Sequence, residues 1–100
     1  MQIKRILQLY KELRTFLERN GDNSIYDTYH YLCDMLEKMQ DIESEELEKE
    51  VVHLYKMLYG NKGGLTEYYI WNEDYTVREK MNAPLDRIRS ELWQLLREYV

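Results

Sequence analysis

The sequence is poor in residues that break helices or cross-link chains. Its 100 residues include four glycines, one proline and one cysteine, Cys33. A single cysteine cannot form an intramolecular disulfide, so the disulfide framework of small secreted proteins is excluded and a reducing, cytoplasmic location is expected. The N-terminus has charges spaced through it and lacks the apolar core of a signal peptide, and no apolar run is long enough to span a membrane.

Positive charge is also scarce. Lysine and arginine number 14 against 19 aspartates and glutamates, which gives a net charge of −5. Phosphate binding depends on clustered basic side chains, so nucleic acid is not an expected ligand. The acid is unevenly distributed, because residues 21–50 carry ten acidic and only two basic side chains.

Hydrophobic residues make up 44% of the whole sequence and charged residues 33%. This composition is typical of a single helical domain that spans residues 1–100. Apolar residues recur every three or four positions in four segments. These segments run from Ile3 to about Arg19, from the Asp22–Ser24 region to Met39, from Ser44 to Leu58, and from the Pro84 region to Tyr99. Short connections between such stripes predict an all-α fold, an antiparallel four-helix bundle with one irregular aromatic connection before the last helix.

Local signals predict where these helices begin and end. Asn20-Gly21 predicts a left-handed stop after the first helix, and the Ser44 hydroxyl is expected to cap the third. The glycine-rich stretch 60–64 ends the third helix. Pro84 is expected in the first turn of the last helix, and residues 73–81 are expected to form a separate short helix that breaks before it.

The irregular connection holds the segment Tyr68-Tyr69-Ile70-Trp71, which has strong β-propensity. One isolated strand has no partner, so a short turn or an extended loop across the bundle end is expected. Tyr68, Tyr69 and Trp71 cannot all face one way in so short a segment. Tyrosine and tryptophan supply much of the binding energy at interface centres, so these three are candidate partner-binding residues, with packing over the bundle end as the alternative.

A run of acidic residues precedes and opens the third helix. It has two interpretations: acids at a helix start offset the helix dipole and aid solubility, or they form a negative docking surface for a basic partner. The candidate residues of that surface are Asp41, Glu43, Glu45, Glu46 and Glu48.

Two carboxylate–histidine pairs, Asp27 with His30 and Glu50 with His53, have the i,i+3 spacing of di-iron bundle ligands. The apolar stripes place most of these side chains outward, and the first and last helices offer leucine, isoleucine, phenylalanine and tyrosine where bridging carboxylates would be needed. His30 and Cys33 could form a nucleophile pair, but the surrounding acids disfavour a thiolate. No metal, cofactor or catalytic set is therefore predicted.

Two stretches, Leu58-Tyr59-Gly60-Asn61-Lys62-Gly63-Gly64-Leu65-Thr66-Glu67-Tyr68 and Leu85-Asp86-x-x-Arg89-x-x-Leu92-Trp93-x-Leu95, resemble the second half of a family of small uncharacterised bacterial proteins. The family has no established activity, and its members are similar in size to immunity proteins encoded beside bacterial toxins. Tyr68-Tyr69 also resembles the tyrosine pair that precedes the last helix in the acidic four-helix immunity proteins of nuclease colicins.

These observations favour a small acidic protein-binding module, an immunity-type inhibitor of a basic toxin or enzyme, without catalytic activity of its own. The alternative is a structural, self-associating protein that forms a homodimer through its aromatic residues. A metalloenzyme built on the two carboxylate–histidine pairs ranks last.

Overall fold

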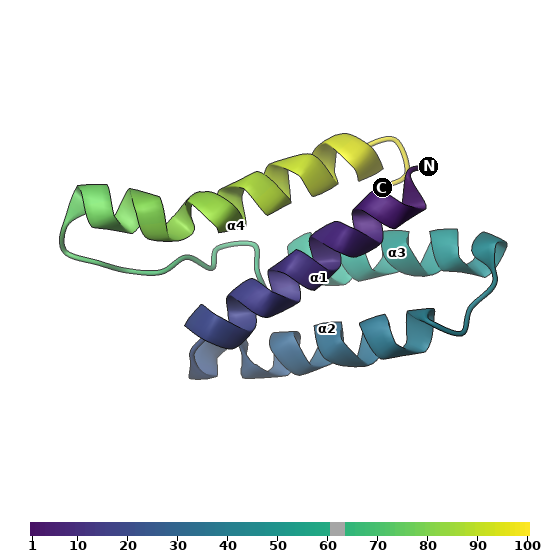
Figure 1. Cartoon of the computed structure of the whole chain (residues 1–100), viewed down its shortest axis with the longest axis horizontal. Coiled ribbons are helices and arrows are strands. Elements are labelled where there is room, and N and C mark those ends of the chain that lie inside the picture. Colours follow the sequence, from purple (N-terminus) through teal and green to yellow (C-terminus); the bar gives the residue numbers. More distant parts are fainter. Residues whose placement is uncertain (61–63) are drawn as a thin grey trace.

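A computed structural model shows an all-helical chain, in which residues 1–60 and 64–100 are described (Figure 1). Its elements are α1 (Ile3–Asn20), a short 3₁₀ turn η1 (Asn23–Ile25), α2 (Tyr26–Met39), α3 (Ser44–Tyr59) and α4 (Tyr75–Leu96). No strand occurs in these two ranges. The prediction of four helices in an all-α fold is confirmed. Residues 61–63, in the middle of the predicted glycine-rich turn, lie outside the described residues.

Helix α1 is the central element, because it makes the two most extensive helix–helix contacts, with α4 and with α2, and also contacts α3. Figure 1 shows it crossing the molecule diagonally between α4 and the α2–α3 pair. Its apolar residues cover a broad face rather than one narrow stripe, which lets one helix pack against three neighbours. The buried residues of α1 are Ile6, Leu9, Tyr10, Leu13, Phe16 and Leu17.

Helices α2 and α3 close the other side of the core. Most of the apolar residues that recur at helical spacing in these two helices are buried, whereas Tyr29 and Leu47 are only half-buried. The Tyr10 hydroxyl donates to the Val51 carbonyl at 2.7 Å, so the one polar atom of that buried side chain is paired with α3. The buried residues of these helices are Leu32, Met35, Leu36 and Met39 in α2, and Val51, Leu54, Tyr55 and Leu58 in α3.

Two of the predicted helix-end signals are wrong. Gly21 is extended (φ −70°, ψ 152°) rather than left-handed, and glycine suits this position because an added Cβ would lie 2.5 Å from the Leu17 carbonyl oxygen. Ser44 is the first residue of α3 and does not cap it, since Glu43 holds the cap position without a side-chain hydrogen bond. Asp22 does cap the η1 turn, because its carboxylate accepts from the Ser24 amide at 2.8 Å.

The predicted helix break before Pro84 is also wrong. α4 is one helix of 22 residues with Pro84 in its interior. It begins at the Asp74 cap, whose carboxylate accepts from the Val77 amide at 3.1 Å. Pro84 cannot donate to the carbonyl four residues earlier, but this part of the helix surface is exposed, so water can solvate that carbonyl. The predicted helix extension to Tyr99 is wrong as well, because α4 ends at Leu96, which is buried, whereas Tyr99 is exposed.

The molecule measures 45 × 25 × 23 Å along its principal axes. The first half of α4 and the connection before it extend together beyond the ends of the other helices (Figure 1). None of the described helices combines the length and the apolar composition that crossing a membrane requires.

Candidate protein-binding site

The connection between α3 and α4 is anchored at its start by Leu65. This side chain is fully buried in the core, and its amide donates to the Leu58 carbonyl at 3.0 Å. The Thr66 hydroxyl donates to the Gly60 carbonyl at 3.0 Å, and the Tyr68 amide donates to the Leu65 carbonyl at 3.4 Å. The chain therefore enters the following segment from a fixed position. That segment contains no helical turn and runs beside the first half of α4 (Figure 1).

Residues 68–72, which we call the strap, alternate in exposure. Tyr68, Ile70 and Asn72 are half-buried, whereas Tyr69 and Trp71 are exposed. A period of two is the pattern of a β-strand with one face on a core and one face toward solvent. The strap has this pattern although it has no strand beside it.

Asn82 of α4 takes the place of that missing strand. Its side-chain oxygen accepts from the Ile70 amide at 2.7 Å, and its side-chain nitrogen donates to the Ile70 carbonyl at 2.9 Å. The same nitrogen donates to the Arg78 carbonyl at 2.8 Å, which fixes the amide on its own helix. Asn82 is the one buried polar residue among those described, and its side chain makes three hydrogen bonds.

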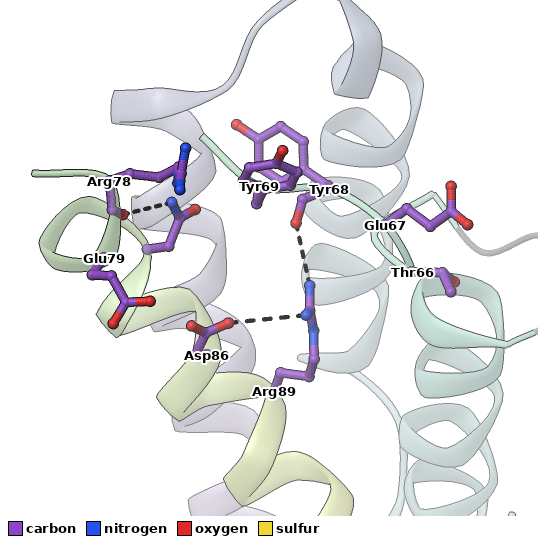
Figure 2. A pocket seen from close by; sticks show the side chains of 9 residues that line it. Thr66, Glu67, Tyr68, Tyr69, Arg78, Glu79, Asp86 and Arg89 are labelled. Atoms are coloured by element: carbon purple, nitrogen blue, oxygen red, sulfur yellow. Dashed lines mark hydrogen bonds and ion pairs between the residues drawn. The ribbon is translucent and has the colours of Figure 1, made fainter. Parts of the chain in front are cut away.

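Two arginines of α4 bind the strap on either side of this pair. Arg89 donates through Nη2 to the Leu65 and Tyr68 carbonyls, at 3.1 and 3.3 Å, and Arg78 donates through Nη1 to the Asn72 carbonyl at 3.4 Å. Figure 2 shows these side chains facing the strap from one side of α4. Arg89 binds Tyr68, Asn82 binds Ile70 and Arg78 binds Asn72, so residue numbers fall along α4 as they rise along the strap. The strap therefore runs antiparallel to α4.

The spacing of these contacts fits the two backbones. Two residues of an extended chain advance about 6.6 Å, and one i,i+4 step of a helix advances about 6 Å. Ile70 and Asn72 can therefore meet Asn82 and Arg78 in register, while the longer step to Tyr68 is covered by the long Arg89 side chain. The strap is thus held by a row of α4 side chains.

The exposed faces of the strap and of α4 together form an aromatic cluster, which consists of Tyr69, Trp71, Tyr75 and Arg78. Tyr69, Trp71 and Tyr75 are 55%, 65% and 63% exposed. The Tyr69 and Trp71 rings meet edge to face with centroids 6.5 Å apart. The Arg78 guanidinium lies 4.7 Å from the Trp71 ring centroid and 5.3 Å from that of Tyr75, within cation–π range.

The structure thus separates the three predicted aromatic residues. Tyr69 and Trp71 are exposed, as the sequence required of at least one of the three. Tyr68 is instead half-buried, and its hydroxyl donates to the Asn20 carbonyl at 3.2 Å. Burial also raises the pKa of Tyr68.

Tyr75 and Arg78, which complete the cluster, were not predicted as site residues. A signal was present, since Tyr75 and Arg78 are three residues apart and share a helix face. The predicted break before Pro84 made residues 73–81 a separate short helix instead of the first half of a long one.

Beside the cluster lies a polar cavity of about 300 Å³, shown in Figure 2. Three of its lining side chains, Arg78, Asn82 and Arg89, already bind the strap. Arg89 also lies over the Tyr59 ring at 5.7 Å. Burial raises the pKa of Tyr59, and the neighbouring guanidinium offsets part of that shift. The cavity therefore supports the strap. Its lining residues are Thr66, Glu67, Tyr68, Tyr69, Arg78, Glu79, Asn82, Asp86 and Arg89.

The predicted acidic residues lie at the other end of the molecule. The α2–α3 connection is at the right of Figure 1, whereas the strap is at the left. All five side chains are exposed, and within residues 1–60 and 64–100 none of them forms an ion pair. They do not join the aromatic cluster in one surface. These residues are Asp41, Glu43, Glu45, Glu46 and Glu48.

The carboxylate–histidine pairs are placed as the apolar stripes indicated. Asp27 and His30 are exposed, and the His30 ring stacks on Tyr26 with centroids 4.3 Å apart. Glu50 lies 3.6 Å from Lys38 Nζ, and His53 is exposed. In the part of the chain that the structure describes, no three histidine, cysteine or carboxylate side chains are grouped so that they could hold a metal.

Comparison of the chain with protein-family models, with curated proteins and with solved structures found no match.

Proposed function

We propose that this chain is a small acidic protein-binding module, in which an antiparallel four-helix bundle presents the aromatic cluster to a basic protein. The observation that supports this most directly is the exposure of Tyr69, Trp71 and Tyr75 around Arg78. Tryptophan, tyrosine and arginine are the residue types most enriched among those that dominate interface energies.

The support beneath the cluster strengthens this proposal. Exposed aromatic side chains on a mobile loop would lose conformational freedom on binding, which costs about 0.5–1.5 kcal/mol for each ordered side chain. Here Ile70, between Tyr69 and Trp71, is held at both backbone groups by Asn82. The cluster is therefore largely in place before a partner arrives.

The charges near the cluster favour a basic partner. Residues 67–80 carry four acidic and two basic side chains, and one of the basic ones, Arg78, is stacked between aromatic rings. The five acids at the start of α3 lie at the far end of a molecule 45 Å long. Charges are screened within about 8 Å at physiological salt, so those acids would act as a separate negative surface.

An immunity-type inhibitor of a basic toxin or enzyme is the particular role we propose for this module, acting in a reducing, cytoplasmic compartment. Such an inhibitor needs a rigid anchor and a negative field that speeds encounter with a basic target. The aromatic cluster and the net charge of −5 supply both properties. Neither nucleic acid, nor a membrane, nor catalysis by this chain is part of the proposal.

The test is affinity capture from a lysate of the cells that express this chain. The double variant Tyr69→Ala/Trp71→Ala is compared with wild type and with Trp93→Ala, which removes an exposed tryptophan outside the cluster. A basic protein retained by wild type and by Trp93→Ala, but lost by the double variant, supports the proposal. Its binding should then be reproduced with the purified partner. Equal retention by all three forms would contradict it.

Self-association remains the second proposal, because other large apolar side chains are exposed away from the cluster. Met57 and Trp93 are both 49% exposed, and Tyr99 and Val100 are 45% and 44% exposed. A homodimer that covers them would show a molar mass that rises with concentration, and Trp93→Ala would shift that rise to higher concentration. A constant monomer mass in both forms would remove this alternative.

A further inference from the structure

The strap has two backbone edges, and α4 occupies only one of them. In an extended chain, successive residues direct their N–H and C=O groups to opposite edges. The groups that bind α4 belong to the even-numbered residues: the Tyr68 carbonyl, both groups of Ile70, and the Asn72 carbonyl. The backbone groups of Tyr69 and Trp71 therefore lie on the other edge.

That second edge is without partners in the described structure. Among residues 1–60 and 64–100, no hydrogen bond reaches the N–H or C=O of Tyr69 or of Trp71. In Figure 1 the later part of the strap runs beside the first half of α4, beyond the ends of the other helices. An unpaired edge is a template for another extended chain.

From these contacts we infer that the strap binds an extended, basic peptide segment of a partner protein as an added β-strand, paired with the backbone of Tyr69 and Trp71. Main-chain hydrogen bonds would hold the segment, and its side chains on the exposed face would pack beside the two aromatic rings. This inference rests on the proposed function, since it specifies how the module holds its partner.

The charges at the two ends of the strap identify the chemistry of the segment. Glu67 precedes the strap and Glu73 follows it, and both side chains are exposed. The chain bends at both residues, so a strand paired with the strap would bring the residues at its two ends close to these carboxylates. Lysine or arginine at those positions forms opposite-charge pairs, which stabilise cross-strand contacts, whereas acids there would repel.

The same charges argue against a second copy of this chain as the added strand. An antiparallel pair that sets Tyr69 opposite Trp71 of the second copy would use all the unpaired groups of both straps. It would also bring Glu67 close to Glu73 of the second copy at both ends of the pair. Like charges that lie close together repel, so the symmetric arrangement is disfavoured.

The test uses the full chain and a defined probe, an acetylated and amidated octapeptide of alternating lysine and valine. Amide hydrogen exchange is followed by NMR, residue by residue, with and without the peptide. Exchange at Tyr69 and Trp71 should slow about tenfold or more at saturating peptide, while Ile70, already bonded to Asn82, changes little. An otherwise identical glutamate–valine octapeptide should leave all three unchanged.

Two variants at one position separate backbone pairing from side-chain contact. Trp71→Ala removes the ring and keeps the amide, whereas Trp71→Pro removes both, and proline is compatible with an extended chain at an unpaired edge. Protection of the Ile70 amide shows that the strap keeps its place in each variant. The lysine–valine peptide should bind Trp71→Pro about tenfold more weakly than Trp71→Ala.

Three results would overturn the inference: equal affinity of the two Trp71 variants, equal protection by the acidic peptide, or protection that grows with protein concentration when no peptide is present. The last result would identify a second copy as the added strand. Failure here and failure of the proposed function are distinguishable. Equal affinity of the Trp71 variants removes only the mode of pairing, whereas the binding role falls if the double variant retains the captured partner.

Discussion

The two halves of α4 are held in place by different means. The second half, residues 85–96, buries Leu85, Ile88, Leu92 and Leu96 in the core. In the first half, residues 75–84, the one buried side chain is Asn82, whereas Tyr75 and Val77 are exposed. One continuous helix thus combines a half stabilised by apolar burial with a half stabilised by polar contacts to the strap. The polar half can open locally while the rest of the fold stays intact.

Substitution in the apolar half should have the largest effect on global stability. Leu92→Ala removes a fully buried side chain and leaves a cavity, so the free energy of unfolding should fall by about 2–5 kcal/mol. Chemical denaturation followed by circular dichroism measures this. Its neighbour Trp93 is 49% exposed, and Trp93→Ala should cost much less. Equal losses would mean that the described core is wrong.

Substitution in the polar half should act mainly on the strap. Asn82→Ala leaves both backbone groups of Ile70 and the Arg78 carbonyl without their partner, a loss of about 1–3 kcal/mol. Amide exchange at Ile70 should therefore accelerate far more than exchange at Leu92. Gln94→Ala, an exposed change in the apolar half, is the matched control. Uniform acceleration throughout α4 would show that its two halves open together.

At Pro84, on the boundary between the two halves, a substitution should raise the stability of the protein instead of lowering it. Proline costs about 3 kcal/mol relative to alanine inside a helix, partly offset by about 0.4–1 kcal/mol because it restricts the unfolded chain. Pro84→Ala should therefore stabilise the protein by about 2–2.6 kcal/mol, seen as a rise in the thermal midpoint. Ala83→Gly, which weakens the helix at the next position, should lower it. A destabilised Pro84→Ala variant would mean that Pro84 shapes the helix for the strap.

The sequence predicted the apolar half well and the polar half poorly. Stripe positions such as Leu85, Ile88 and Leu92 follow from helical periodicity alone, and they are buried as expected. Pro84 is a local signal for a helix break, but contacts of Asn82 with a segment twelve residues earlier in the chain favoured a continuous helix. No local pattern encodes that contact, because an asparagine is equally suited to a turn, a cap or a surface position.

The same contrast holds within the candidate site. The exposure of Tyr69 and Trp71 could be anticipated from alternation in a short segment, since neighbouring side chains of an extended chain face opposite ways. The separation of the acidic residues from the aromatic cluster follows from chain order as well, because the two segments lie at opposite ends of α3. The contact of Arg78 with Trp71 could not be anticipated, because it depends on how the strap packs against α4.

The smallest predicted effect concerns an ion pair that ties the apolar half of α4 to α1. Arg5 Nη2 lies 2.6 Å from Glu91 Oε2, and this hydrogen bond holds the pKa of Glu91 below its ordinary value of 4.5. A lowered carboxylate pKa stabilises the fold above pH 4.5, and that contribution disappears as the pH falls through the lower folded-state pKa.

Glu91→Gln should therefore be slightly less stable than wild type near pH 7, and the difference should vanish in acid. Urea melts of both proteins between pH 7 and pH 3 measure it. Glu46→Gln, an exposed carboxylate change at the start of α3, is the control and should change stability little at pH 7. A difference in stability between Glu91→Gln and wild type that grows as the pH falls would contradict the stabilising role of the Arg5–Glu91 ion pair.

The hydrogen bonds of Asn82 also make the strap sensitive to chemical ageing. Its side-chain nitrogen faces two carbonyl oxygens, those of Ile70 and Arg78. Hydrolysis of this amide to a carboxylate would replace a donor with a negatively charged acceptor, and two attractions would become repulsions. The modified side chain would then release the strap from α4 and disperse the aromatic cluster, while the buried leucines kept the rest of the molecule folded. The chain would gain only about one dalton in mass.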